Sequence, residues 1–257
     1  MSGRWVVRVS VAPVNAEARV GSEQVSQALF GHPVEPLDAG EREPWHRVRL
    51  HDGYEGWMHR GYLSESDRSH SPNGAGPSRV SLGCVVREAA GARLALPLGA
   101  WLHDALAVES GEAIDGAAIA RRFPPRAPAA AATACARFEG TPYEWGGLTP
   151  WGADCSGLVQ TVFGLHGIAL PRDARDQAEQ GEPVTAGDAL GGLAAGDLAF
   201  FSDRDDGPIT HVAIALGGSR LVHLGLGRGG YAVENLAAPD AYARALLSRF
   251  RWARRVG

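Results

Sequence analysis

Hydrophobic and polar positions alternate in short runs over the first 63 residues. Residues 45–50 alternate cleanly, Asp52-Gly53 supplies a hairpin turn signal, and residues 54–59 form the expected second arm. The run from Trp5 to Val11 also mixes apolar and polar positions. Short strands joined by such turns favour a small β-barrel over residues 1–64.

Two segments separate this region from the rest of the chain. Residues 65–79 are rich in Ser, Pro, Gly and charge, which indicates a linker. Residues 80–126 contain apolar runs, among them 93–102, and predict a second small β unit. Prolines between residues 123 and 128 then interrupt the pattern.

From Ala127 the pattern changes to helical spacing. The Ala-rich run 127–138 predicts a helix, and a second is expected from Asp154 or Cys155 to about Gly167. Strands are expected after these helices, at residues 197–202, 211–216, 221–226 and 231–235. Helices followed by antiparallel strands predict an α+β domain over residues 127–257.

Composition narrows the class of protein. The chain has 257 residues, 45% hydrophobic and 21% charged, which is typical of a soluble globular protein. A net charge of −4 argues against nucleic acid or a membrane surface as partner. No run approaches the roughly 18 apolar residues of a membrane span, and residues 1–20 lack a secretory pattern. We therefore expect a cytoplasmic location.

The chain has three cysteines, which cannot all pair with one another. Cys84 lies in an apolar strand-like run and Cys135 in the Ala-rich helix, so both are expected to be small buried hydrophobes. No CxxC pair is present, and we expect neither a metal site nor a cofactor.

Cys155 has different surroundings. It follows the glycine-containing loop 146–152 and sits at the expected start of a helix, with Asp154 as a natural N-cap. Free N–H groups and the helix dipole stabilise a thiolate there, so a lowered thiol pKa is expected. Cys155 is the candidate nucleophile.

Two histidines lie on neighbouring expected strands, His211 and His223, joined by the turn 217–219. A three-residue loop makes them diagonal neighbours on one face, whereas a two-residue loop puts them on opposite faces. In the first case His211 is the base for the thiol and His223 fixes its tautomer. The alternative is a buried thiol with two incidental strand histidines.

Several motifs together resemble the NlpC/P60 cysteine peptidases. They are Gly140-Thr-Pro-Tyr-Glu-Trp-Gly-Gly147, Asp154-Cys-Ser-Gly-Leu-Val-Gln160, Leu170-Pro-Arg-Asp173, Gly196-Asp-Leu-Ala-Phe-Phe201, Thr210-His-Val212 and Val222-His223. Residues 4–63 are similar to bacterial SH3 domains, notably Gly53-Tyr-Glu-Gly-Trp57. The chain thus looks like a γ-D-glutamyl-L-diamino acid endopeptidase with SH3-like modules.

This resemblance implies a multidomain protein, with two small SH3-like β-barrels followed by a papain-like α+β NlpC/P60 domain. It also implies a catalytic triad of Cys155, His211 and His223. The implied substrates are murein peptides with a free N-terminal L-Ala, such as L-Ala-γ-D-Glu-diaminopimelate or its Lys counterpart. Cleavage would follow the γ-D-Glu residue.

The resemblance further implies oxyanion and substrate contacts, carried by Tyr143, Trp145, Asp154, Ser156, Asp173 and Glu55. The Tyr143 hydroxyl would assist the Cys155 backbone N–H at the oxyanion. Asp173, and Glu55 from the first module, would bind the L-Ala ammonium.

Plainer interpretations and departures stay open. Asp154 and Asp173 could only cap helices, Asp173 could pair with a neighbouring arginine, Tyr143 and Trp145 could pack in the core, and Glu55 could be a solvated charge. No tyrosine occurs between residues 84 and 93, and residue 174 is Ala rather than Ser, which weakens amine recognition. Competing functions are a cell-wall-binding SH3 protein with an idle peptidase domain, and a thiol acyltransferase or amidase.

Overall fold

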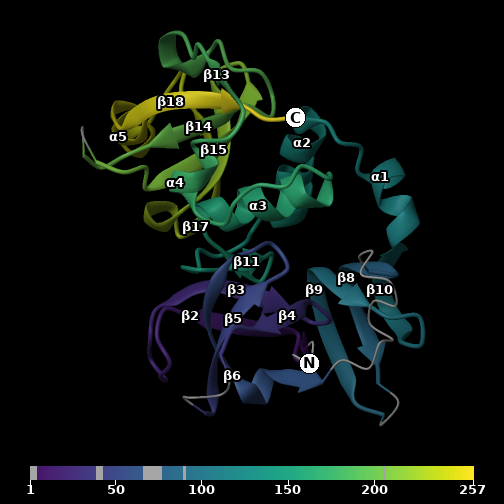
Figure 1. The fold of residues 1–257 in the computed structure, drawn as a ribbon. Helices are drawn as coiled ribbons and strands as arrows, with labels where there is room; N and C mark the ends of the chain where they lie inside the picture. Colours follow the sequence, from purple (N-terminus) through teal and green to yellow (C-terminus); the bar gives the residue numbers. More distant parts are fainter. Residues whose placement is uncertain (1–4, 39–42, 66–76, 89–90, 205–206) are drawn as a thin grey trace. The chain divides into compact units, whose positions relative to one another are not determined.

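The computed structural model describes residues 5–38, 43–65, 77–88, 91–204 and 207–257 (Figure 1). It divides into two compact units, Met1–Ile119 and Ala120–Gly257. Most of the predicted linker, residues 66–76, lies outside the described residues.

The first unit begins with a seven-stranded sheet of order β3-β2-β6-β5-β4-β1-β7. Its strands are β1 Trp5–Val7, β2 Val11–Asn15, β3 Gln24–Leu29, β4 Pro33–Pro36, β5 Trp45–Leu50, β6 Glu55–His59 and β7 Leu63–Glu65. The predicted hairpin is confirmed: β5 pairs with β6 antiparallel, and Gly53 takes a positive φ of 87° in the turn. Alternate residues of β5 are buried, as its pattern predicted.

The second segment of this unit is a three-stranded antiparallel sheet of order β10-β8-β9. Its strands are β8 Arg79–Arg87, β9 Arg93–Leu102 and β10 Ala107–Asp115. Leu29 of β3 and Phe30, which follows this strand, belong to the same buried cluster as Val86 and Leu96. The two sheets therefore share a core, and a second domain of SH3 type stays a prediction.

The second unit contains the predicted helices and sheet. The helices are α1 Ile119–Arg122 at its beginning, α2 Ala127–Phe138, α3 Cys155–Leu165, α4 Ala174–Gln177 and α5 Ala241–Ser248. The strands are β11 Leu148–Thr149, β12 Gly152–Ala153, β13 Glu182–Val184, β14 Leu198–Phe201, β15 His211–Gly217, β16 Arg220–Gly225, β17 Gly230–Asn235 and β18 Phe250–Arg255. The antiparallel sheet has the order β13-β18-β14-β15-β16-β17, which confirms the α+β prediction.

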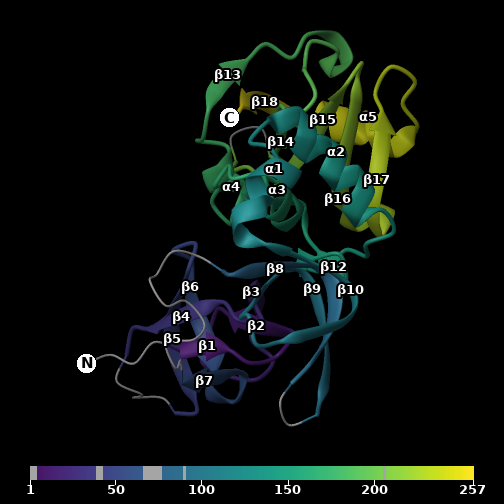
Figure 2. The ribbon, with the colours of Figure 1, turned by 90° about the vertical axis from the view of Figure 1, so that its right-hand side faces the viewer.

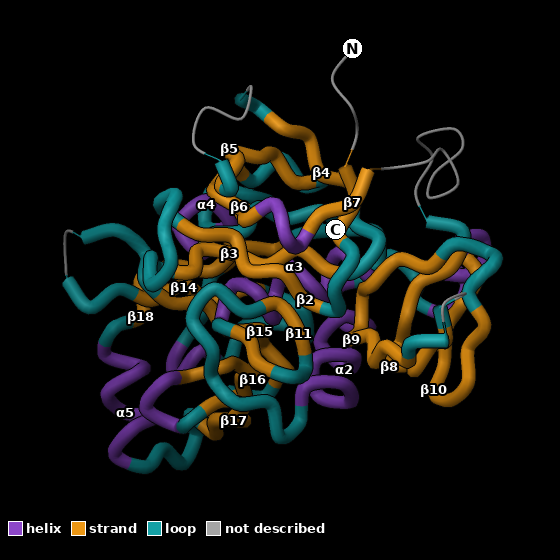
Figure 3. The backbone as a smooth tube through the Cα atoms, turned by 90° about the horizontal axis from the view of Figure 1, so that it is seen from below, coloured by secondary structure: helices purple, strands orange, loops and turns teal. Residues whose placement is uncertain are grey.

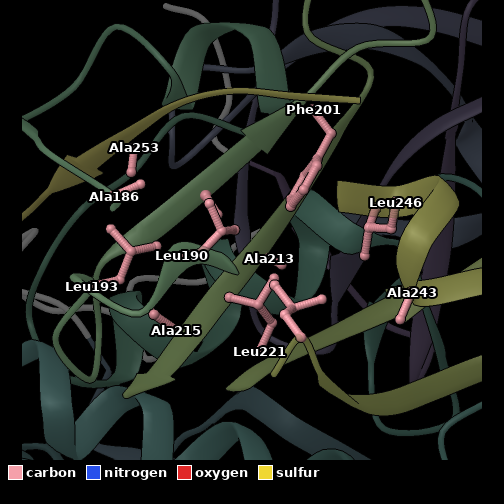
Figure 4. Packing of buried hydrophobic residues seen from close by; sticks show 12 residues of the cluster. Ala186, Leu190, Leu193, Phe201, Ala213, Ala215, Leu221, Ala243, Leu246 and Ala253 are labelled. Atoms are coloured by element: carbon pink, nitrogen blue, oxygen red, sulfur yellow. The ribbon is translucent and has the colours of Figure 1, made fainter. Parts of the chain in front are cut away.

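Both faces of this sheet are covered. One face contributes Phe201, Ala213 and Leu221 to a buried cluster that also contains Leu246 of α5 (Figure 4). Helices α2 and α3 pack together and against β15 and β16 (Figure 2). Figure 3 shows the same helices beside these strands from another direction. Helix α3 is therefore held against α2 and the β15–β16 part of the sheet.

In the described part of the chain, no helix combines the length and apolar character needed to cross a membrane.

Candidate active site

Cys155 is the first residue of α3, as the sequence predicted. Asp154 caps the helix, and its Oδ1 accepts a hydrogen bond of 2.7 Å from the Gly157 N–H. The cap residue and Cys155 are both buried. A Cβ at position 157 would collide with the Gly147 carbonyl oxygen, so glycine is needed for the loop to lie this close to the helix.

Asp154 is also the centre of a buried polar network. Arg172 donates to Asp154 Oδ1 at 3.1 Å and to Oδ2 at 2.7 Å, and Gly146 N–H donates to Oδ2 at 2.9 Å. The Ser156 hydroxyl donates to Asp154 at 3.1 Å and accepts from Arg172 at 2.8 Å. These contacts fix the start of α3 against the segment that carries Arg172. The predicted substrate contacts of Asp154 and Ser156 stay predictions.

The pKa of the Cys155 thiol is not lowered, as the sequence led us to expect, but raised. Burial and the charge of Asp154 raise its pKa to about 12, despite lowering contributions from Arg172 and from backbone hydrogen bonds of Val212 and Ser156. Desolvation thus outweighs the helix terminus, and the resting side chain is a neutral thiol. Such a thiol needs a base to become a nucleophile. Its contact with the Val212 backbone places it beside the start of β15.

The histidine hairpin combines both loop lengths considered from the sequence. Its tip has two residues, Gly218 and Ser219, both with positive φ as a type I′ turn requires, and Gly217 pairs with Arg220. A bulge at Leu216 then shifts the register so that Ala215 pairs with Leu221. The shift restores the register of a three-residue loop.

The two histidines consequently lie on one face and touch. His211 Nε2 is 2.8 Å from His223 Nδ1, and the ring centroids are 4.9 Å apart at 82°. Burial, followed by the charges of His223 and Arg249, lowers the pKa of His211 to about 3. The imidazole is therefore neutral and has a lone pair for a proton. Because Nε2 faces His223, Nδ1 is the nitrogen available to a thiol.

One neighbour of this pair was missed from the sequence. His223 Nε2 lies 3.3 Å from Oε1 of Glu234, a carboxylate that is only 3% exposed. Its signal is a charged residue at a buried position of the predicted strand 231–235. Recognising that signal requires the strand register, which the sequence pattern leaves undetermined.

Tyr143 and Trp145 lie in the loop before Cys155. Burial, then the charges of Cys155 and Asp154, raise the pKa of the half-buried Tyr143, so its hydroxyl keeps a proton to donate. Trp145 is 59% exposed, which excludes the alternative that it packs in the core.

The two carboxylates expected to bind an amine are in different units. Asp173 precedes α4 at the N-cap position without a side-chain cap bond, and burial raises its pKa. Glu55 belongs to the first unit, where it forms ion pairs with Arg47 at 3.0 Å and Arg49 at 2.8 Å. A role for either in amine recognition stays a prediction.

Among the residues that the structure describes, no group of three or more His, Cys, Asp or Glu side chains is placed to hold a metal ion.

Comparison with known families finds two matches. Residues 140–248 match the NlpC/P60 family, and residues 10–64 match the bacterial SH3 domain. The first match contains Cys155, His211, His223 and Glu234.

Curated relatives resemble a part of the chain. It is 42% identical over 87 residues to the gamma-D-glutamyl-L-lysine dipeptidyl-peptidase of Bacillus subtilis, covering 34% of this chain and 28% of that protein. It is 45% identical over 87 residues to the bifunctional muramidase/DL-endopeptidase CwlT of the same species, covering 33% and 25% respectively. The chain thus matches well under two thirds of the length of either relative.

Among solved structures, a crystal structure of an NlpC/P60 family protein from Bacillus cereus matches with a TM-score of 0.78 and 20% identity. The match covers 98% of this chain and 99% of that one, and at this identity it shows the fold alone. The residues matched in the two families show that the chain carries a bacterial SH3 domain followed by a domain of the NlpC/P60 family.

Proposed function

We propose that this protein is a cysteine peptidase that hydrolyses the bond between γ-D-Glu and a diamino acid in murein peptides with a free N-terminal L-Ala. The observation that carries the proposal is the contact of His211 with His223, together with the contact of the Cys155 thiol with the backbone of Val212, the residue after His211. The substrate class is supported by the relatives named for γ-D-glutamyl-L-lysine and DL-peptide cleavage.

The neutral states of thiol and imidazole decide how the reaction begins. His211 Nδ1 takes the proton of the Cys155 thiol as the sulfur attacks the γ-carbonyl carbon of D-Glu. The Cys155 backbone N–H and the protonated Tyr143 hydroxyl are the proposed donors to the resulting oxyanion.

Collapse of the tetrahedral intermediate breaks the C–N bond. The His211 imidazolium returns its proton to the departing amine of the diamino acid, which leaves a thioester on Cys155. Water then attacks the thioester with His211 again as base, releasing L-Ala-γ-D-Glu and the free thiol. Each proton taken by His211 is returned within the cycle.

Mass analysis of cleavage tests this proposal. Wild type, Cys155→Ala and Cys135→Ala proteins are incubated with L-Ala-γ-D-Glu-diaminopimelate, its Lys counterpart and their N-acetylated forms. We expect cleavage of the free-amine peptides, a loss of about 10³-fold or more in Cys155→Ala, and ordinary rates in Cys135→Ala.

Other outcomes separate the alternatives. Binding without cleavage indicates an idle domain, and products joined to an added amine indicate acyl transfer. Equal cleavage of acetylated and free-amine peptides contradicts amine recognition but is compatible with peptidase activity. A cytoplasmic location remains part of the proposal, and cell fractionation tests it.

A further inference from the structure

Glu234 is a buried carboxylate between two exposed residues of the edge strand β17. Its side chain is 4% exposed, whereas Val233 is 38% exposed and Asn235 is also exposed. Burying a carboxylate is costly unless it is paired and hydrogen-bonded. A residue that merely filled this position would not need a charge, so the partners of Glu234 indicate its role.

Strand register places Glu234 in line with the two histidines. In the pairing of β16 with β17, Leu221 lies opposite Glu234 and Ala232 lies opposite His223. Directly paired residues point to the same face, so Glu234 is the diagonal neighbour of His223. Continuing the register of β15 and β16 places Ala213 opposite His223 on its other side.

Alanine is therefore the direct cross-strand neighbour of His223 on both sides. These small side chains leave room for the longer diagonal residues, His211 from β15 and Glu234 from β17, to reach the same ring. The outcome is a continuous row across three strands, in which His211 contacts His223 at 2.8 Å and His223 contacts Glu234 at 3.3 Å.

Arg228 keeps this carboxylate ionised. Its Nε donates to Glu234 Oε1 and its terminal nitrogen to Oε2, both at 2.7 Å. Burial alone would raise the pKa of Glu234, but the hydrogen bonds from His223 and Arg228 outweigh it and lower the pKa to about 2. Arg228 also lies 4.3 Å over the ring of Tyr242, which stacks on His223.

An ionised carboxylate fixes the proton positions along the row. Glu234 can only accept, so His223 Nε2 carries the proton of that contact. In the tautomer of His223 that is protonated at Nε2, Nδ1 has a lone pair and accepts from the Nε2–H of His211. This leaves the lone pair of His211 on Nδ1, the nitrogen that the thiol requires.

We propose that Glu234 is a positioning residue of the catalytic site, which fixes the tautomers of His223 and His211 and stabilises the imidazolium that forms on His211. This inference rests on the proposed function. When the Cys155 proton moves to His211 Nδ1, the new positive charge is shared along hydrogen bonds that end at an anion. No proton transfers to Glu234.

The charged and titratable groups around the row are few in the described structure. His223 faces Glu234 from β16, Arg228 faces it from the turn before β17, and Tyr242 of α5 and Asp240 at the cap of that helix also interact with its charge. Arg249 adds a positive charge near His211. Glu234 is thus the carboxylate in contact with the histidine pair.

Two substitutions at position 234 test the role. Glu234→Gln keeps the size and removes the charge, and its amide can donate to His223 and invert both tautomers. We expect kcat/KM on L-Ala-γ-D-Glu-diaminopimelate to fall about 10- to 100-fold with KM unchanged. Loss of the anion lowers the pKa of His211, so the acidic limb of the pH profile moves to lower pH. Glu234→Asp retains the charge and should restore part of the rate and the wild-type limb.

Asp240→Asn is the matched control. Asp240 is the other carboxylate bound to Arg228, at 2.8 Å, but its side chain is 57% exposed. Asn also preserves the cap of α5, whose Ala243 N–H bonds to this side chain. This variant should stay within about twofold of wild type. Thermal melting of all variants measures folding.

A second measurement does not depend on cleavage. The rate at which iodoacetamide alkylates Cys155, mapped by peptide mass across pH, reports transfer of the thiol proton. It should slow in Glu234→Gln and remain as in wild type in Asp240→Asn. If wild type cleaves no murein peptide, the proposed function fails, while this measurement still tests the positioning role.

Two outcomes would overturn the proposal. One is a Glu234→Gln protein whose turnover and alkylation both stay within about twofold of wild type. The other is a loss of rate without movement of the acidic limb, with Glu234→Asp impaired equally, since that pattern describes a structural residue.

Discussion

Each unit contains a contacting pair of histidines, and the pairs differ in what their nitrogens bind. In the first unit, the ring centroids of His32 and His51 are 4.4 Å apart and the ring planes meet at 68°, a geometry similar to that of His211 and His223. His32 Nδ1 accepts from the Leu29 N–H at 3.3 Å, and its Nε2 bonds to the Gly99 carbonyl at 3.1 Å. Both ring nitrogens of His32 are therefore bonded to backbone groups.

The pair in the second unit is bound by side chains. His211 contacts His223, and His223 contacts the carboxylate of Glu234, so a positive charge on the histidine pair would be stabilised by an anion. Burial lowers the pKa of both His32 and His211. Burial and ring contact alone thus do not distinguish a structural histidine from a catalytic one, and the partners of the two nitrogens do.

Replacing the first histidine of each pair should give the largest difference between the two units, in activity for one and in stability for the other. His211→Gln is expected to reduce kcat/KM by about 10³-fold or more with little change in Tm. His32→Leu leaves the Leu29 N–H and Gly99 carbonyl unpaired, which costs about 1–3 kcal/mol each, with peptidase activity per folded molecule retained. Urea unfolding and peptide cleavage check both. Loss of activity in folded His32→Leu would break the comparison.

The buried ion pair between Arg172 and Asp154 at the start of α3 is expected to affect both stability and activity. Arg172→Met leaves Asp154 with a buried charge that its arginine no longer compensates, and we expect a loss of about 3–5 kcal/mol in the free energy of unfolding. Activity should fall as well, because this network holds the residue before Cys155. Retained stability in urea would show that the backbone donors to Asp154 suffice.

Lowering the pH should reveal how much the ionised Glu234 contributes to the free energy of unfolding. Its folded pKa of about 2 lies below its unfolded value of about 4.3, so its ion pair stabilises the protein above about pH 4.3. That contribution is lost as the pH falls through about 2. The difference in unfolding free energy between wild type and Glu234→Gln should therefore be constant near neutrality and shrink in acid. A difference independent of pH would contradict the assignment.

The smallest effect is expected at Glu55. Its ion pairs with Arg47 and Arg49 are solvent-exposed, so Glu55→Gln should leave Tm almost unchanged. If Glu55 binds the substrate amine as the family resemblance implies, KM for the free-amine peptide rises while that for the acetylated peptide does not. Equal kinetics on both peptides would assign Glu55 to the surface of the first unit.

The sequence by itself determined the local elements and singled out Cys155 as the candidate nucleophile. Turn residues and period-two alternation predicted the hairpin at Asp52-Gly53, and helix propensity predicted the run 127–138, both confirmed. Asp154 before Cys155 predicted the capped helix start because capping depends on neighbours in the chain. These features are governed by interactions over a few residues.

Only the tertiary structure decided how distant residues meet. The bulge at Leu216 sets the histidines on one face, and the register of β17 brings in Glu234, because a shift of one residue reverses the face of every following side chain. The pairing of Arg172 with Asp154 depends on the packing of its segment against α3. The raised pKa of Cys155 has the same origin, since desolvation depends on how the whole domain encloses the thiol.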